Sequence, residues 1–190
     1  MQNVPVSSAQ AWLRPAYTGR LLQPLGTNKE NKMTGYDKLL AEVEKFQASH
    51  RRSDSPRFDI EPPYDLFPQL GSTVIPYKFH WPTPWANADR KGAYALLDNE
   101  ANVLYVGKAS MGSCFAARFV AYFAYENDRS CKIKHPNCWS RTPRYVLTIA
   151  VPIETPWEAP GLEEFLIRKL QPPDNGTGRV LVDPTVKLDS

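Results

Sequence analysis

The chain has 190 residues, an apolar fraction of 42% and a formal net charge of only +3. This length suits one domain with additional segments, and no apolar run reaches the length of a membrane span. Three cysteines cannot form a closed set of disulfides, and the N-terminus lacks an apolar core of signal-peptide length. We therefore expect a cytoplasmic protein that does not contact a membrane.

The first third of the chain predicts an extension rather than part of a sheet. Residues 1–33 are polar, interrupted by prolines and without periodicity, so we expect them to be disordered. Thr34 and Asp37 then resemble a capping box. A helix over 36–47 is predicted from the apolar stripe that follows, made of Leu39, Leu40, Val43 and Phe46.

Residues 58–90 are rich in prolines and aromatic residues. Prolines cannot donate to a central sheet ladder, so we expect the segment to wrap the domain and bury its rings on the surface of the core. A platform on which nucleobases stack is the alternative function of such rings. With the helix at 36–47, this segment makes up a predicted N-terminal extension over 34–90.

Residues 91–183 predict a small α+β domain with the order β-β-α-β-α, followed by a tail at 184–190. The stretches GAYALLD (92–98) and NVLYVGKA (102–109) predict a hairpin with Asn99 in the turn. Ser113 is the predicted cap of a helix that runs to about Glu126, and 127–143 reads as a basic loop. A central antiparallel sheet of three strands is completed by PRYVLTIAVP, and RVLVD (179–183) predicts an edge strand.

The stretch GLEEFLIRKLQPPDN predicts a helix that begins after a break at Pro156–Gly161. At about 100° per residue, one broad arc holds the apolar side chains Leu162, Phe165, Leu166, Ile167 and Leu170, and Glu163 falls inside it. Glu164 lies on the opposite side, at the spacing of an ion pair with Arg168. An inward carboxylate needs a metal ion or an arginine as its partner, unless it lies at the edge of the core and reaches water.

Two other groups of side chains have both a structural and a functional interpretation. On the helix after Ser113, Arg118 and Tyr122 lie opposite the core stripe, where an arginine can bind a phosphate or pack its stem on a ring. Tyr94 and Tyr105 lie on neighbouring strands, where simple packing explains them as well. Gly107 is expected to let the chain turn closely before Lys108.

Between Tyr105 and Tyr145 the basic residues outnumber Glu126 and Asp128. This stretch predicts a polyanion partner, with a solvated surface as the alternative. The basic residues are Lys108, Arg118, Arg129, Lys132, Lys134, Arg141 and Arg144.

In combination these residues resemble a known enzyme family. GAY at 92–94, YVGK at 105–108, Arg118 with Tyr122, then Glu163 and Asn175 follow one another as the motifs of GIY-YIG nucleases do. The resemblance covers about residues 90–176. Alanine and valine replace the middle isoleucines, at positions that should only pack.

The resemblance implies a metal-dependent phosphodiesterase in which Glu163 binds Mg²⁺ or Mn²⁺, the metal acting as a Lewis acid. Tyr94 would deprotonate or orient the attacking water, with Lys108 favouring its phenolate. Arg118 would hold the scissile phosphate. Water and phosphate would be positioned by Tyr105 and Tyr122, and the site braced by Asn175, which otherwise reads as a turn residue.

We therefore expect a standalone DNA endonuclease, of restriction type or an interbacterial toxin, that acts on double-stranded DNA. Because each chain offers one site, a homodimer on DNA or sequential cutting by a monomer would be needed to cut both strands. The alternative is an inactive nucleic-acid-binding module of the same fold. A zinc site at Cys131, His135 and Cys138 is weaker, because structural zinc sites have four ligands.

Overall fold

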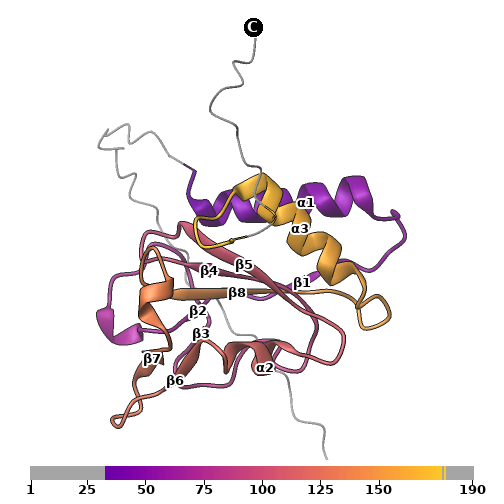
Figure 1. Ribbon diagram of the computed structural model, residues 1–190. Helices are drawn as coiled ribbons and strands as arrows, with labels where there is room; N and C mark the ends of the chain where they lie inside the picture. The colour runs from indigo at the N-terminus through magenta and orange to yellow at the C-terminus, as the bar shows by residue number, and fades with distance from the viewer. Residues whose placement is uncertain (1–32, 177, 179–190) are drawn as a thin grey trace, which may run out of the picture. The chain divides into compact units, whose positions relative to one another are not determined.

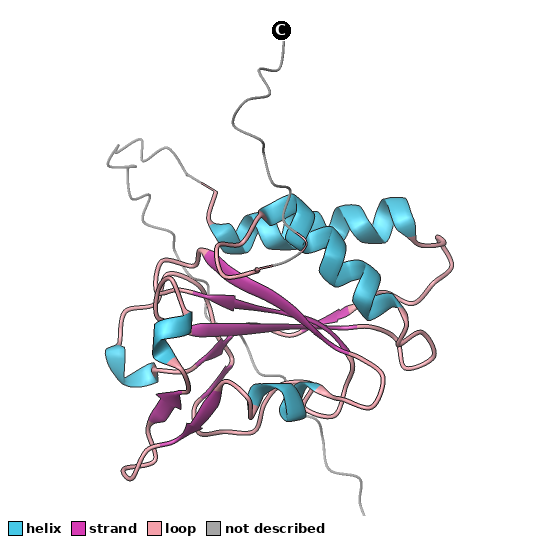
Figure 2. Cartoon of the chain, in the orientation of Figure 1, coloured by secondary structure: helices cyan, strands magenta, loops and turns pink. Residues whose placement is uncertain are grey.

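The computed structural model describes residues 33–176 and 178, shown in Figures 1 and 2. None of the helices in this part of the chain is long and apolar enough to cross a membrane. The elements follow in the order α1 (Gly35–His50), β1 (Asp59–Ile60), β2 (Tyr64–Asp65), β3 (Phe79–His80), β4 (Gly92–Leu97), β5 (Val103–Ala109), α2 (Phe115–Phe119), β6 (Phe123–Tyr125), β7 (Cys131–Ile133), β8 (Tyr145–Ala150) and α3 (Glu158–Leu170), with 3-10 turns at Pro68–Leu70 and Pro136–Cys138.

The centre of the fold is an antiparallel sheet in which β4 lies between β5 and β8. β4 and β5 form the predicted hairpin, and Asn99 lies in its turn. Every residue of β4 and β8 is buried, as expected for strands covered on both faces. The predicted α+β class is confirmed.

The segment 58–90 contributes more than a surface wrap. β1 and β2 both pair antiparallel with β8, and β3 pairs in parallel with β2, so this segment extends the sheet beyond the three predicted strands. Each of these strands is only two residues long, which fits the many prolines between them. The rings of Tyr64 and Trp81 are buried, as predicted.

Alternate residues of β4 belong to two different cores, one on each face of the sheet. Ala93, Ala95 and Leu97 pack with residues of α1 and α3, whereas Tyr94 and Leu96 pack with α2 and the aromatic segment. Figure 1 shows α1 and α3 together on one side of the sheet and α2 on the other. Side chains on adjacent positions of this strand therefore serve opposite layers.

The predicted N-terminal helix is confirmed as α1, which ends three residues later than expected. Its capping box is present: Thr34 Oγ1 accepts from Asp37 N at 3.1 Å, and Thr34 N donates to Asp37 Oδ2 at 3.0 Å. The side chains of Leu39 and Val43, on the inner face of this helix, are fully buried.

Two predicted helix boundaries are wrong. α3 begins at Glu158 instead of after Gly161, because Pro160 lies in the first turn, where its missing N–H has no intrahelical partner to lose. α2 begins after Cys114 and ends at Phe119, because Phe123–Tyr125 pairs with Cys131–Ile133. The 127–143 stretch is consequently not a plain loop.

Several predictions lie outside the described residues. These are the disorder of residues 1–33 (except Met33), the edge strand at 179–183 and the tail at 184–190.

Arg144 is a structural residue, so its prediction as a DNA contact is wrong. It is buried immediately before β8 and forms an ion pair with the buried Asp65, with Nη2 and Oδ2 at 3.2 Å. Its guanidinium also donates to the carbonyl oxygens of Ser72 at 3.1 Å and Gly71 at 3.0 Å, and to Asn99. A phosphate could reach it only if these contacts were lost.

Replacement of Arg144 by alanine should strongly destabilise the fold. It leaves Asp65 buried without its partner, which costs about 3–5 kcal/mol in the free energy of unfolding. Urea unfolding measures the loss. Arg141→Ala is the control, because Arg141 is exposed and its removal should cost clearly less. Equal losses for the two variants would contradict this role of Arg144.

Candidate functional site

Three tyrosines from different elements converge on the α2 face of the sheet, and we call them the tyrosine cluster. Tyr94 lies on β4, Tyr105 on β5, and Tyr122 between α2 and β6. Their ring centroids are 6.1–6.2 Å apart in every pair. The hydroxyls of Tyr94 and Tyr122 share a hydrogen bond of 2.8 Å. Tyr94 is fully buried and the other two are half-buried, so the cluster has one inner and two outer members.

Gly107 leaves room for this cluster. It lies opposite Tyr94 in the β4–β5 ladder. A Cβ at this position would lie 2.5 Å from Tyr94 Oη and 2.7 Å from Tyr105 Cε1, closer than real Cβ contacts. The prediction that Gly107 turns the chain is wrong, because β5 runs on without interruption to Ala109.

Arg118 supplies a positive charge beside the cluster. Its side chain is exposed, and hydrogen bonding to Tyr94 raises the pKa of Arg118, so the guanidinium stays charged. Among the described residues no carboxylate forms an ion pair with it. An exposed guanidinium without an acidic partner can bind an oxyanion.

Tyr94 is a hydroxyl rather than a phenolate at neutral pH. Burial foremost, then the neighbouring Tyr122, raises the pKa of Tyr94 far above the ordinary value, and Arg118 only partly opposes the shift. Lys108 does not assist ionisation, because its amine pairs with Glu163 instead. The interpretation that Lys108 favours the phenolate is therefore wrong. Tyr94 is fully buried, and its hydroxyl contacts the outer members of the site through Tyr122 and Arg118.

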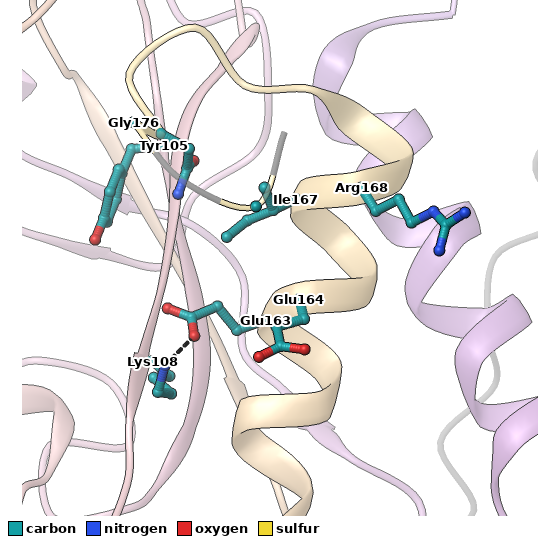
Figure 3. Close-up of a pocket in the computed structure, with 9 residues that line it drawn as sticks. Tyr105, Lys108, Glu163, Glu164, Ile167, Arg168 and Gly176 are labelled. Atoms are coloured by element: carbon teal, nitrogen blue, oxygen red, sulfur yellow. Dashed lines mark hydrogen bonds and ion pairs between the residues drawn. The ribbon is translucent and has the colours of Figure 1, made fainter. Parts of the chain in front are cut away.

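Glu163 and Lys108 meet on the opposite face of the sheet. Lys108 pairs with Ala93 across the ladder and so faces α3, where its Nζ forms an ion pair with Glu163 Oε2. The Glu163 side chain is only 12% exposed. Figure 3 shows its carboxylate directed at Lys108. Its predicted inward orientation is confirmed.

The neighbouring Glu164 is exposed, as its position on the helix predicted. The expected ion pair with Arg168 does not form in the described part of the chain. Arg168 instead extends away from the Glu163–Lys108 pair in Figure 3. The two adjacent acids thus differ both in burial and in having a cationic partner.

A cavity of about 590 Å³ lies at the Glu163–Lys108 pair. Tyr105 also lines it and thereby connects the tyrosine cluster to Glu163. Burial foremost, then Tyr122 and the charge of Glu163, raises the pKa of Tyr105 above its ordinary value. β5 is the last strand of the sheet, so groups from its two faces can meet around its edge. The other lining residues are Glu164, Ile167, Arg168, Asn175, Gly176 and Gly178.

Asn175 braces this edge instead of merely forming a turn. Its Oδ1 accepts from Val106 N at 2.9 Å and its Nδ2 donates to Val106 O at 2.8 Å. The preceding Asp174 N donates to Leu104 O at 2.9 Å. The segment after α3 is thus fixed along the free side of β5, next to the cavity.

The remaining basic residues do not share one environment. Lys132 pairs with Glu126 at 3.4 Å, and Arg141 with Asp98 at 2.9 Å. Lys134 donates to Val120 O at 2.6 Å and lies at the tyrosine cluster. Arg129 is exposed. Of the basic residues predicted to bind DNA, Lys108, Arg118 and Lys134 therefore lie next to the site, and Arg168 also lines the cavity.

The side chains that could hold a metal ion fit a hard divalent cation better than zinc. Cys131 is buried, which raises its pKa to about 12, and among the described residues no group of three or more His, Cys, Asp or Glu could hold a metal ion. Mg²⁺ needs only one or two carboxylates, because it keeps several waters and takes substrate oxygens. Glu163, whose carboxylate lies at the cavity and pairs with Lys108, is the residue that would hold such an ion if Lys108 moved aside.

Two residues next to the cluster, Trp139 and Asp174, were not among the predicted site residues. The Trp139 ring centroid lies 5.9 Å from that of Tyr105 and 5.7 Å from that of Tyr122. Asp174 Oδ1 accepts from Ser140 N at 3.0 Å, which joins the Trp139 loop to the segment after α3. An aromatic residue within a polar loop was the one signal in the sequence.

No protein-family model, curated protein or solved structure matches this chain. The interpretation of the site therefore depends on its geometry and on the resemblance of its motifs.

The tyrosine cluster predicts a loss of stability in alkali. Unfolded tyrosines ionise near pH 10, whereas burial keeps Tyr94 and Tyr105 protonated above that value in the folded protein. The unfolded chain then binds fewer protons, so the free energy of unfolding should fall as the pH rises from about 9 to 11. Tyr94→Phe should reduce this slope in urea titrations. The exposed Tyr125→Phe is the control, and an equal effect of both would refute the prediction.

Proposed function

We propose that this chain is a metal-dependent endonuclease of the GIY-YIG type that hydrolyses phosphodiester bonds in double-stranded DNA. One observation carries the proposal: two groups of side chains from opposite faces of the sheet meet around Tyr105 at the edge of β5. One group is the tyrosine cluster with Arg118, and the other is Glu163 with Lys108. These groups are far apart in the sequence, and each has a role in cleaving a phosphodiester.

Arg118 binds the scissile phosphate, because it is charged, exposed and lacks an ion-pair partner among the described residues. The fully buried Tyr94 lines neither cavity, so its hydroxyl holds Tyr122 in place, and the half-buried Tyr122 orients the attacking water. Tyr105 lies between these groups and the cavity, where it can hydrogen-bond to a phosphate oxygen.

Glu163 is the ligand for Mg²⁺ or Mn²⁺, and the bound ion supplies Lewis-acid stabilisation of the developing charge. Lys108 neutralises Glu163 in the absence of the ion. Once displaced, its amine lies at the cavity and can bind a phosphate oxygen. Each chain carries one such site, so two copies or two successive cuts are needed to break a duplex.

A second function is favoured by the same ion pair. Lys108 already provides the positive partner that the Glu163 carboxylate needs, so the chain could bind nucleic acid without metal or catalysis. The two functions differ in one testable respect: cleavage requires the charge of Glu163, whereas binding without catalysis does not.

Glu163→Gln and its neighbour Glu164→Gln test the proposed function. The first substitution keeps the size of the side chain but removes the charge that binds the metal, so plasmid cleavage in Mg²⁺ should fall at least about 100-fold. Glu164 lines the same cavity but is exposed and lacks an ion pair with Arg168, so its variant should cut normally. Both should melt close to the wild type. Full cleavage by Glu163→Gln would refute the assignment of the metal ligand.

Lys108→Met tests whether the lysine competes with the metal. Without its ammonium group, the Glu163 carboxylate is free, and the affinity for Mn²⁺ without DNA should rise roughly five-fold. Isothermal titration measures it. Lys132→Met, which removes the exposed partner of Glu126, is the control and should have no effect. Weaker Mn²⁺ binding by Lys108→Met would mean that Glu163 is not the ligand.

A further inference from the structure

A second cavity, of about 260 Å³, lies on the outer side of the tyrosine cluster. Three of its lining residues are aromatic: Tyr105, Tyr122 and Trp139. The Trp139 ring packs edge-on against both tyrosines, with interplanar angles of 83° and 70°. Tyr105 also lines the cavity at Glu163, so the two cavities are neighbours.

Two polar atoms of the residues around this cavity have no hydrogen-bond partner among the described residues. They are Trp139 Nε1, a donor, and Asp174 Oδ2, an acceptor, and neither atom is accessible to solvent. Most buried polar atoms in proteins are hydrogen-bonded. A ligand that enters the aromatic cavity and displaces the atoms covering these two groups would supply the missing donor and acceptor.

The cavity is braced from two sides. Asp174 accepts from Ser140 N through Oδ1 at 3.0 Å, and its own N–H donates to Leu104 O at 2.9 Å. Asn175 is anchored to Val106 next to it. The loop that carries Trp139 is thereby attached to the edge of the sheet, so the cavity exists before a ligand arrives.

We propose that this cavity is a nucleobase subsite, which takes one unstacked base of the DNA strand whose phosphate lies at Arg118. This inference rests on the proposed function. Aromatic side chains bind the faces of unstacked bases, and hydrogen bonds at the base edge select among them. Lys134, which also lines the cavity, adds positive charge for the phosphate backbone.

The subsite should prefer adenine, cytosine or guanine over thymine. An ionised carboxylate only accepts hydrogen bonds, and the exocyclic amino groups of the three bases can donate to Asp174 Oδ2. Trp139 Nε1 can then donate to an acceptor on the same base. The single ring N–H of thymine lies between two carbonyl oxygens, which repel a carboxylate.

The test measures binding separately from cleavage. Pentanucleotides d(TTXTT), with X as adenine, cytosine, guanine, thymine or an abasic site, are titrated in EDTA and followed by fluorescence anisotropy. The three amino-bearing bases should bind about five-fold or more tightly than thymine or the abasic site.

Two conservative variants identify the groups that select the base. Trp139→Phe keeps a ring but removes the N–H, and should abolish most of the preference. Asp174→Asn keeps an acceptor for Ser140 N and places an amide donor in the cavity, so the preference should shift towards thymine. Trp157→Phe is the matched control, because Trp157 is 71% exposed and does not line the cavity.

The outcomes separate the two proposals. Equal binding of all five ligands by the wild type, or an unchanged preference in both cavity variants, would overturn the subsite even if plasmid is cut. A preference that is lost in Trp139→Phe, in a protein that cuts no plasmid in Mg²⁺, would support the subsite and reject the nuclease.

Discussion

The register between β4 and β5 determines where every group of the candidate site lies. It places Tyr94 over Gly107 and Lys108 beside Ala93. Because side chains alternate between the faces of a sheet, adjacent residues of β5 serve opposite layers, and a shift by one residue would exchange them. The tyrosine cluster and the Glu163 pair can meet only because β5 is the last strand of its sheet.

The charge of each group in the site matches how deeply that group is buried. The inner tyrosine remains neutral because it is enclosed, and the guanidinium of Arg118 stays near the surface. The largely buried carboxylate of Glu163 is matched by an amine that is more exposed than itself. That amine can leave for solvent at little cost, whereas the carboxylate needs some cation in its place. The protein alone thus maintains a position that a divalent ion could take.

Features set by local periodicity could be predicted from the sequence, and features set by distant contacts could not. The capping box of α1 and the inward Glu163 follow from spacings within one element, and the hairpin follows from two consecutive strands joined by a short turn. The α2 boundary was missed because Phe119 and Phe123 fit a helical stripe equally well, and pairing of β6 with β7 decides the outcome. Arg144 was misread because its partner, Asp65, lies 79 residues away. The cavity at Trp139 likewise depends on Asp174, which follows another helix.

The side chain of Asn175 has a consequence for how molecules of this protein behave towards one another. An outermost strand presents unpaired backbone groups, which can recruit a strand from a second molecule and start aggregation. The amide of Asn175 imitates one residue of such a strand, since it both accepts from and donates to the backbone of Val106. The same amide that fixes the wall of the candidate site therefore also occupies backbone groups of β5 that a strand of a second molecule would otherwise pair with.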